Sequence, residues 1–465
     1  MLSVQGTLPV NILRKPFLRP GPLILDAMVH VPDLRLLGFI DSKFLPRRGF
    51  LKGEVHVTGS WDKPVGKVTF QGDQLYPPAL LKPFPSGPLA LSGTVSFDRE
   101  DLVADSIQGD SPSLKFTCGG AWKGIGLLPS LLGGANVNLR GETHFQGDLT
   151  VKDLGWLAAG VSGLRRVSGR MAGTFAVAGP ASNPTINATV RLSDGELRSD
   201  MDLPSEDGVN LVATMSPEGL HLKTFTGRLG GAPFAVTGSV QRKDGAVFIA
   251  DLRLKGKNLL YYRQKGVKLR ADTDVTFKGP LSRLEAGGTL AVTDGYFDQY
   301  FNLLGFLRGS GPPRTEEGFG LFSLRTEPFR SMTFDVSITA VNPFKIRSNL
   351  VTVLLRPDLK LGGTGEVPML TGNVYLDSGR LILPAGNVSL ETGVVRFTTK
   401  DPARPLLDVT GKSRMYGYDV SLVVEGPYDE PTVTLSSVPP LSNEEVLLLV
   451  LTGRRPVSTG GTTTA

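Results

Sequence analysis

A glycine–proline signal recurs along this chain where apolar and polar residues alternate. Its complete copies are Gly59 and Pro64, Gly179 and Pro184, Gly363 and Pro368, and Gly426 and Pro431. A fifth copy at Gly279 keeps the spacing but has Leu284 in place of proline. Glycine adopts turn conformations at low steric cost, and proline restricts the backbone of a turn. Each copy therefore predicts a β-hairpin, and the chain is expected to consist largely of short strands.

A second glycine follows three of these signals at a fixed distance of sixteen residues. The pairs are Gly179 and Gly195, Gly279 and Gly295, and Gly363 and Gly379, with Asp194, Asp294 and Ser378 before the second glycine. This pattern predicts a strand of about eight residues that turns again at the Asp-Gly or Ser-Gly pair. The intervals between successive copies fall from 120 to 63 residues. Uneven intervals favour a long antiparallel sheet over a solenoid of constant period.

The alternation places apolar side chains on one face of many strands. The candidate residues of this apolar face are Val55, Val57, Phe175, Val177, Val420, Leu422 and Val424. Their neighbours are mostly polar or small and point to the opposite face, because side chains alternate along a strand. The chain has few amphipathic helices that could cover such a face. The sheet is therefore expected either to fold on itself as a sandwich or barrel, or to leave an apolar groove that another molecule fills.

The charge pattern argues against a nucleic-acid partner. The chain has 465 residues and a formal net charge of +6, and its basic residues are scattered in short clusters such as Arg165-Arg166. Nucleic-acid binding requires a basic patch or stripe, so none is expected. The single cysteine, Cys118, excludes an intramolecular disulfide. It lies in a strand-like stretch, where it is expected to pack as a small apolar residue.

No sequence pattern predicts catalysis. The chain lacks the nucleophile elbow, the phosphate-binding loop, the dinucleotide fingerprint and the zinc-binding His-Glu-x-x-His motif, and its four histidines are far apart. Asp272 and Asp274 place two carboxylates on one face of a strand. Such a pair can serve acid–base chemistry, but a solvated strand face is the favoured interpretation. We therefore expect no catalytic residue, no metal site and no cofactor.

The chain is expected to divide into three β-rich regions and a tail. The predicted bounds are 1–165, 166–330 and 331–455, with a disordered tail at 456–465. Short helical patterns near 151–160 and 299–307 are expected to lie against the sheet or to plug its end. The first residues contain neither a signal peptide nor a membrane span, and they resemble the middle of a strand. We therefore expect further sequence upstream.

The last apolar segment predicts a helix over residues 443–452. Ser442 and Glu445 have the spacing of a capping box, and Gly453 stands where the helix should end. Residues 446–451 are apolar all round, so this helix must be buried or must face a lipid or a partner. Covering the end of the sheet is the favoured interpretation, and docking to a partner or membrane is the alternative. The candidate partner-facing residues are Leu441, Val446, Leu447, Leu448, Leu451, Gly453 and Arg454.

The end of the chain resembles the C-terminal domain of the TamB family. The resemblance rests on the stretch from Pro402 to Asp408, the strand from Tyr418 to Gly426, Pro431, the Ser437-x-Pro-Pro-Leu-Ser segment, the Glu-Val-Leu helix and Gly453-Arg454. It is strongest from Phe334 to Arg455, and it continues more loosely through the glycine–proline pattern back to residue 30. TamB is the inner-membrane-anchored part of the translocation and assembly module, within the wider AsmA-like group.

The resemblance implies an all-β fold, in which an elongated antiparallel sheet is curled into an open apolar groove, with a few short helices. It further implies a non-enzymatic bridge across the periplasm that carries phospholipid acyl chains to the outer membrane. The C-terminal end would meet a TamA-type outer-membrane barrel protein and support outer-membrane protein assembly and secretion. Family members also carry an inner-membrane anchor at the start, which this chain lacks.

Two other classes of function stay open at this stage. One is an assembly factor that pairs with outer-membrane β-strands and carries no lipid, for which an open sheet edge would serve. The other is a β-rich structural or adhesin repeat protein, which predicts a closed, packed core and no specific role for the terminal helix. An enzyme ranks last, because no cluster of catalytic residue types is present.

Overall fold

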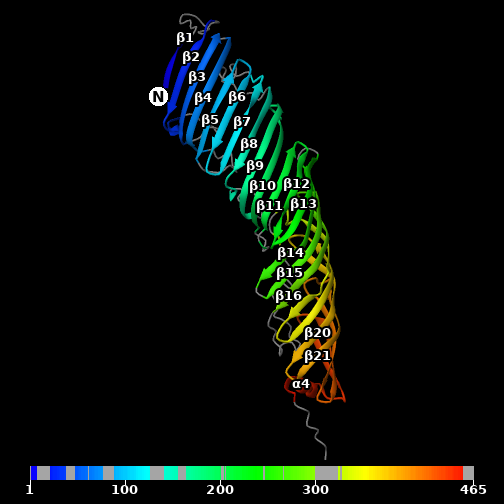
Figure 1. Cartoon of the computed structure of the whole chain (residues 1–465). Coiled ribbons are helices and arrows are strands. Elements are labelled where there is room, and N and C mark those ends of the chain that lie inside the picture. The colour runs from blue at the N-terminus through cyan, green and yellow to red at the C-terminus, as the bar shows by residue number, and fades with distance from the viewer. Residues whose placement is uncertain are drawn as a thin grey trace, which may run out of the picture. The chain divides into compact units, whose positions relative to one another are not determined.

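A computed structural model describes most of the chain. The described residues are 2–7, 21–37, 48–60, 62–76, 88–125, 141–155, 164–199, 204, 206–243, 247–264, 266–298, 323–324 and 327–453. Within these residues 24 strands belong to one sheet, which is mostly antiparallel, and one α-helix closes the chain (Figure 1). The predicted all-β class, antiparallel pairing and C-terminal helix are confirmed.

The chain forms two compact units, and each is considered by itself. Unit 1 comprises Met1–Ser199, Asp207–Thr226 and Ser239–Ala246, and unit 2 comprises Asp200–Glu206, Gly227–Gly238 and Val247–Ala465. The predicted three-part division stays a prediction. Val151 ends a strand, while residues 156–160, the predicted helix at 299–307 and the tail at 456–465 lie outside the described residues.

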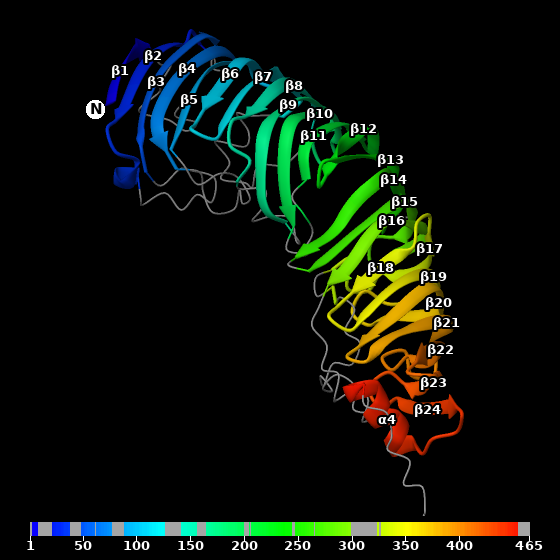
Figure 2. The ribbon, with the colours of Figure 1, turned by 60° about the horizontal axis from the view of Figure 1, so that its bottom comes forward.

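The elements of unit 1 are strands and one short 3-10 helix. They are β1 (Leu2–Thr7), β2 (Ile24–Val31), η1 (Leu34–Leu37), β3 (Phe50–Ser60), β4 (Lys63–Leu75), β5 (Leu89–Phe97), β6 (Leu102–Asp110), β7 (Leu114–Lys123), β8 (Glu142–Val151), β9 (Leu164–Pro180), β10 (Thr185–Ser199) and β11 (Glu206–Ser216). Two further strands contribute residues to both units, and they are β12 (Gly219–Leu229) and β13 (Ala232–Lys243). Successive strands of unit 1 lie side by side in one curved layer (Figure 2).

The elements of unit 2 end with the helix. They are β14 (Val247–Gln264), β15 (Val267–Pro280), β16 (Glu285–Asp298), β17 (Thr333–Ala340), β18 (Phe344–Arg347), β19 (Val351–Gly363), β20 (Pro368–Leu383), β21 (Gly386–Phe397), β22 (Leu406–Met415), β23 (Tyr418–Pro427), β24 (Thr432–Val438) and α4 (Asn443–Thr452). The antiparallel order is interrupted at β16, which pairs in parallel with both β17 and β18. Both of these strands then pair antiparallel with β19.

The glycine–proline signals form hairpins, as predicted. Gly59 lies opposite Pro64 in the β3–β4 pair, and Gly363 lies opposite Pro368 in the β19–β20 pair. All five copies join consecutive antiparallel strands, and the glycine at or next to the end of the first strand has a positive φ in each, for example +107° at Gly59. Glycine is favoured there because this backbone region excludes most side chains.

The predicted second turn at the Asp-Gly or Ser-Gly pair is wrong. Strands β10, β16 and β20 have 15, 14 and 16 residues and run on through Gly195, Gly295 and Gly379. In each, the pairing register shifts beside this glycine. The extra residue forms a β-bulge, which bends and twists a strand without reversing it. An Asp-Gly pair is compatible with both structures, and the continuing cross-strand ladder selects the bulge.

Candidate functional site

One row of directly paired residues crosses unit 1 without a polar side chain. From β2 to β10 the row runs through Ala27, Val55, Val68, Val95, Ala104, Gly120, Phe145, Val177 and Ile186. Paired residues of neighbouring strands lie on the same face, so the row is continuous. The predicted residues Val55 and Val177 belong to it. Val57 and Phe175 lie on the same face, two positions away along their strands.

The two faces of unit 1 differ in both chemistry and exposure. Val55, Phe175 and Val177 are half-buried and Val57 is buried, whereas Glu54 and Thr174 on the opposite face are exposed. The predicted alternation between an apolar and a polar face is therefore present at these positions of β3 and β9. Because the predicted residues of β3 and β9 are separated by five strands, it is the row between them that joins them into one surface.

Aromatic rings fill the space above glycines on the apolar face of unit 1. Phe70 on β4 lies directly opposite Gly53 on one side and Gly93 on the other. A Cβ atom at Gly93 would lie 2.8 Å from the Phe70 ring, and one at Gly147 would lie 2.8 Å from the ring of Phe175. A strand glycine leaves a gap on its face, and a neighbouring ring can cover it. The apolar face is therefore partly filled by its own side chains.

Unit 2 carries an apolar row of the same kind. From β15 to β24 it runs through Val267, Phe297, Ile346, Val353, Gly379, Leu390, Gly411, Leu422 and Leu435. The predicted residue Leu422 lies in this row, and Val420 and Val424 flank it on the same strand. These three side chains are 1%, 2% and 3% exposed in the order Val420, Leu422, Val424.

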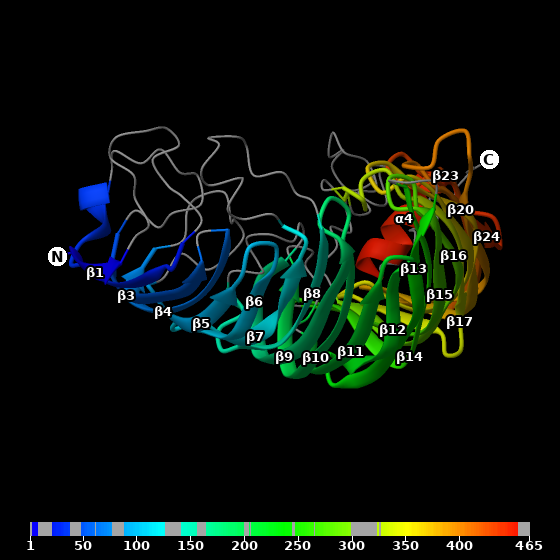
Figure 3. The ribbon, with the colours of Figure 1, turned by 90° about the horizontal axis from the view of Figure 1, so that it is seen from above.

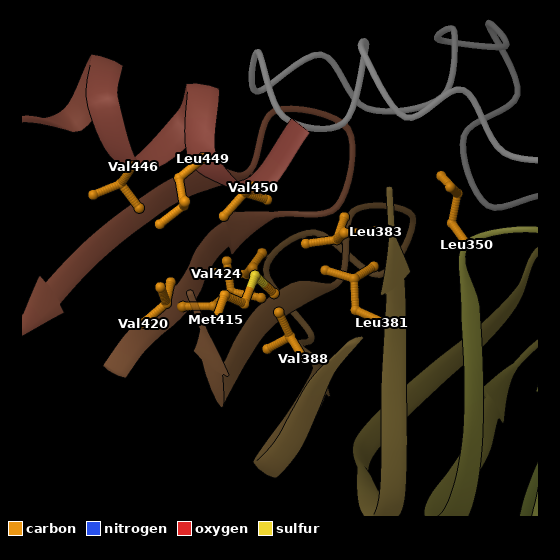
Figure 4. Packing of buried hydrophobic residues seen from close by; sticks show 11 residues of the cluster. Leu350, Leu381, Leu383, Val388, Met415, Val420, Val424, Val446, Leu449 and Val450 are labelled. Carbon is orange, nitrogen blue, oxygen red and sulfur yellow. The ribbon is translucent and has the colours of Figure 1, made fainter. Parts of the chain in front are cut away.

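Helix α4 covers this end of the apolar face. Figure 3 shows it on the concave side of the sheet of unit 2, and Figure 4 shows Val446, Leu449 and Val450 above Val420 and Val424. The three helix residues are fully buried and belong to one cluster with the strand residues. Two turns of helix thus supply the apolar layer that the strands lack here. This agrees with the favoured interpretation of the sequence, in which the helix covers the end of the sheet.

The helix is held in place by the predicted caps. The Ser442 side chain accepts a hydrogen bond from the backbone N–H of Glu445 (3.3 Å), and the Glu445 carboxylate accepts one from the backbone N–H of Ser442 (2.9 Å). The hydrogen bonds from Ser442 hold the pKa of Glu445 below its usual value. Gly453 ends the helix in the left-handed conformation, and its N–H donates to the carbonyl of Leu449. This structure matches the predicted helix in type and bounds.

The candidate partner-facing residues occupy different environments. Val446 points into the cluster, Leu441, Leu447 and Leu451 are half-buried, and Gly453 is the helix cap. Leu448 is 50% exposed and is the most open apolar side chain of α4. Arg454 lies outside the described residues. A partner that meets the helix as it stands would therefore touch Leu448 first.

Ionic groups lie on the polar face of unit 2. Arg253 binds Asp274 through two hydrogen bonds of 2.7 Å, which hold the pKa of that carboxyl below its usual value. Asp272 accepts the backbone N–H of Asn258 (2.7 Å). Of the two carboxylates singled out in the sequence, Asp274 thus pairs with a cation of the neighbouring strand β14, and Asp272 satisfies a backbone N–H of the same strand. In the described part of the chain no three His, Cys, Asp or Glu side chains are grouped to hold a metal ion.

A partly buried ion pair near the C-terminus was not predicted from the sequence. Asp429 is 9% exposed and lies in the turn between β23 and β24. Arg404 donates to its carboxylate and to that of Glu430, at 2.7 Å each. The pair fastens the segment before β22 to this hairpin. The prolines at 402 and 431 marked both turns, but nothing in the spacing of Arg404 and Asp429 indicated that they meet.

Comparison with known proteins identifies the C-terminal half. Residues 223–465, more than half of the chain, match the family model of the TamB C-terminal domain. The match begins within β12 and includes every strand of the apolar row of unit 2 as well as α4. A search of curated proteins finds no match. None of the helices in the described residues has the length and apolar character needed to cross a membrane.

Proposed function

Because the chain belongs to the TamB family, we propose that it is a non-enzymatic, bridge-like periplasmic protein that carries phospholipid between the inner and outer membranes. In this proposal the acyl chains lie against the apolar face and the headgroups remain in water. The protein thereby supports outer-membrane protein assembly and secretion.

The observation that carries the proposal is the unbroken apolar row of unit 1. Among the larger side chains of this row, Val55, Val68, Val95, Phe145 and Val177 are each only half-buried. An acyl chain that covers them gains about 0.8 kcal/mol for each buried methylene group. These contacts have no preferred direction, so a chain can slide from one strand to the next without breaking a specific bond.

The proposal assigns different roles to the predicted groove residues in the two units. Val55, Val57, Phe175 and Val177 contact lipid directly. Val420, Leu422 and Val424 are covered by α4, so lipid reaches them only when α4 leaves. At this end of the chain the helix takes the place of acyl chains, because it offers the same apolar contacts.

The C-terminal end is the proposed contact for a TamA-type outer-membrane barrel protein. The proposed contact residues are Leu441, Val446, Leu447, Leu448, Leu451, Gly453 and Arg454. With α4 seated, Leu448 is the side chain best placed for this contact because it is half exposed. Val446 is accessible to a partner only when α4 has left the sheet.

The lipid proposal is tested by native mass spectrometry and lipid extraction on the chain purified without detergent. The test variant is Val68→Asp with Val177→Asp on the apolar face. The matched control is Thr69→Asp with Thr174→Asp, one position away on β4 and three positions away on β9, at exposed sites of the polar face. Phospholipid should co-purify with the unmodified chain and the control but not with the test variant. A monodisperse, lipid-free unmodified chain contradicts the proposal, as does equal lipid loss in both variants.

A second candidate function rests on the edge of β24. Among the described residues β24 pairs with β23 alone, and Val438 at its end is 69% exposed. A free edge can accept a strand of another protein, and such an assembly factor needs no lipid. Single cysteines at Thr432, Thr434 and Ser436 test it by disulfide crosslinking to a purified barrel protein. Crosslinking with lipid-free chain favours strand pairing, and its absence removes this candidate.

A further inference from the structure

Two β-bulges meet on the polar face of unit 2, opposite the apolar row. In β14 the register shifts between Gly256 and Leu259, which leaves Lys257 and Asn258 without partners on β15. In β16 a second shift leaves Thr293 between the paired residues Val292 and Asp294. The two bulges flank β15, and the Thr293 hydroxyl donates to the Asn258 side chain at 3.0 Å.

A polar pocket of about 810 Å³ lies at these bulges. It is lined by Gly230, Gly231, Ala232, Pro233, Lys257, Asn258, Lys268, Arg270, Thr293, Asp294 and Asn342. The turn between β12 and β13 forms one wall, and the bulges with β15 form the other. Its volume lies in the range of small-molecule sites, roughly 300–1,000 Å³. All of its lining residues belong to unit 2.

The pocket has an excess of positive charge. Three of its lining side chains are cationic, Lys257, Lys268 and Arg270, and one is anionic, Asp294. Asp294 lies directly opposite Arg270 in the strand pair, yet its carboxylate binds Lys268 at 2.5 Å. The guanidinium of Arg270 donates to two neutral carbonyl oxygens, those of Asn258 (2.8 Å) and Gly230 (3.2 Å). Within the described residues no carboxylate is paired with Arg270 or Lys257.

The bulges of β10 and β20 each carry an ion pair between one arginine and one carboxylate. At the bulge of β10, Asp194 pairs with Arg170, and at the bulge of β20, Asp377 pairs with Arg356. At these bulges one cation meets one carboxylate. Asp294 likewise pairs with one cation, Lys268, but the pocket contains two further cations, Lys257 and Arg270. The two carbonyl contacts orient the Arg270 guanidinium but leave its charge uncompensated, and a guanidinium has five N–H donors in all.

We propose that this pocket binds a phosphate group through Arg270 and Lys257. Two uncompensated cations match the charge of a phosphate monoester, one of them suffices for a phosphodiester, and the planar guanidinium fits two phosphate oxygens at once. The phosphate belongs either to a soluble phosphate ester or to a phospholipid headgroup presented by a membrane. The site lies on the face opposite the apolar row and is independent of the acyl-chain path.

The test measures binding of two probes to the full chain. Glycerol 3-phosphate is titrated by calorimetry, and vesicles of phosphatidylglycerol are tested by flotation. The variants are Lys257→Gln and Arg270→Gln. The matched control is Lys255→Gln, on the same strand, which removes an equal charge from a lysine that pairs with Asp274 outside the pocket. Each pocket variant should weaken binding by about tenfold or more, the loss expected for a charged hydrogen bond, and the control should not.

The two probes separate the sources of the phosphate. Saturable binding of glycerol 3-phosphate that depends on Lys257 and Arg270 assigns the site to a soluble ester. If binding depends on Lys257 and Arg270 only when the probe is a vesicle, the site is assigned to a lipid headgroup. Because Arg270 also contacts the backbone, Lys257→Gln decides the outcome, provided that its melting temperature is unchanged. Binding to neither probe, or an equal loss in Lys255→Gln, overturns the proposal.

Discussion

The apolar faces of the two units arise from the same alternation but are completed differently. In unit 1 the residues Val55 and Val177 are half-buried, and rings such as Phe70 fill the gaps above glycines. In unit 2 the residues Val420 and Leu422 are almost fully buried beneath α4. Two surfaces with one sequence pattern thus have different access to solvent. The difference teaches that alternation defines an apolar face, whereas the element packed on it decides whether the face can receive a ligand.

The largest expected effect comes from shortening a leucine in each region. Leu422→Ala, under α4, should lower the local free energy of unfolding by about 2–5 kcal/mol, because a cavity forms in a closed core. Leu91→Ala, half-buried on the apolar face of unit 1, should cost about 1 kcal/mol or less, since little area is lost. Hydrogen exchange of the β23 and β5 peptides measures both. Equal losses would show that the two faces are closed to the same degree.

A glycine pair tests whether rings complete the face of unit 1. Gly53 and Gly93 both lie opposite Phe70, but a Cβ at Gly93 would lie 2.8 Å from its ring and one at Gly53 only 3.6 Å from the nearest atom, the carbonyl oxygen of Thr69. Gly93→Ala should therefore destabilise the sheet by about 1–3 kcal/mol through overpacking against the Phe70 ring and against the Ser106 carbonyl oxygen, which is also 2.8 Å away. Gly53→Ala is the matched control and should be nearly neutral. Thermal unfolding distinguishes them, and similar losses would mean that the ring does not determine the packing.

Loss of the helix cap should weaken the packing of α4 on the sheet of unit 2 without unfolding that sheet. Ser442→Ala removes the side-chain acceptor for the Glu445 N–H and should cost about 1 kcal/mol of helix stability. Hydrogen exchange should rise in residues 443–452 and in β23 but not in unit 1. Ser436→Ala, at an exposed site on β24, serves as the control. Unchanged exchange in β23 would show that the strand core is closed without α4.

The smallest expected difference concerns pH, because each unit has a similar carboxylate–cation pair on its polar face. Hydrogen bonds from Lys152 and Arg253 hold the pKa values of Asp110 in unit 1 and Asp274 in unit 2 below their usual range. Each carboxylate thus stabilises the fold above its unfolded pKa, and this contribution is lost as the pH falls through the lower folded value. Urea unfolding of Asp110→Asn and Asp274→Asn should show a small, similar loss at neutral pH that vanishes in acid. A loss confined to one unit would show that the polar faces differ.

Much of the local structure could be predicted from the sequence. The glycine–proline hairpins, the two faces of the strands and the capped helix each depend on residues close together in the chain. The Asp194-Gly195 and Asp294-Gly295 pairs were misassigned as turns, because a bulge and a turn use the same residue types and only the partner strand tells them apart. The Arg404–Asp429 pair and the cationic pocket join residues 25 to 112 positions apart, for which no local signal exists.

The sequence by itself determined that this chain is a sheet with one apolar face and a capped C-terminal helix that is apolar over residues 446–451, since side-chain alternation and turn chemistry act over a few residues. Tertiary structure alone decided that Val446, Leu449 and Val450 pack on Val420 and its neighbours, while Val55 and Val177 keep part of their surface open. Burial of apolar surface is non-directional and can be satisfied by any apolar partner. Which partner covers which strand is therefore set by the path of the chain in space.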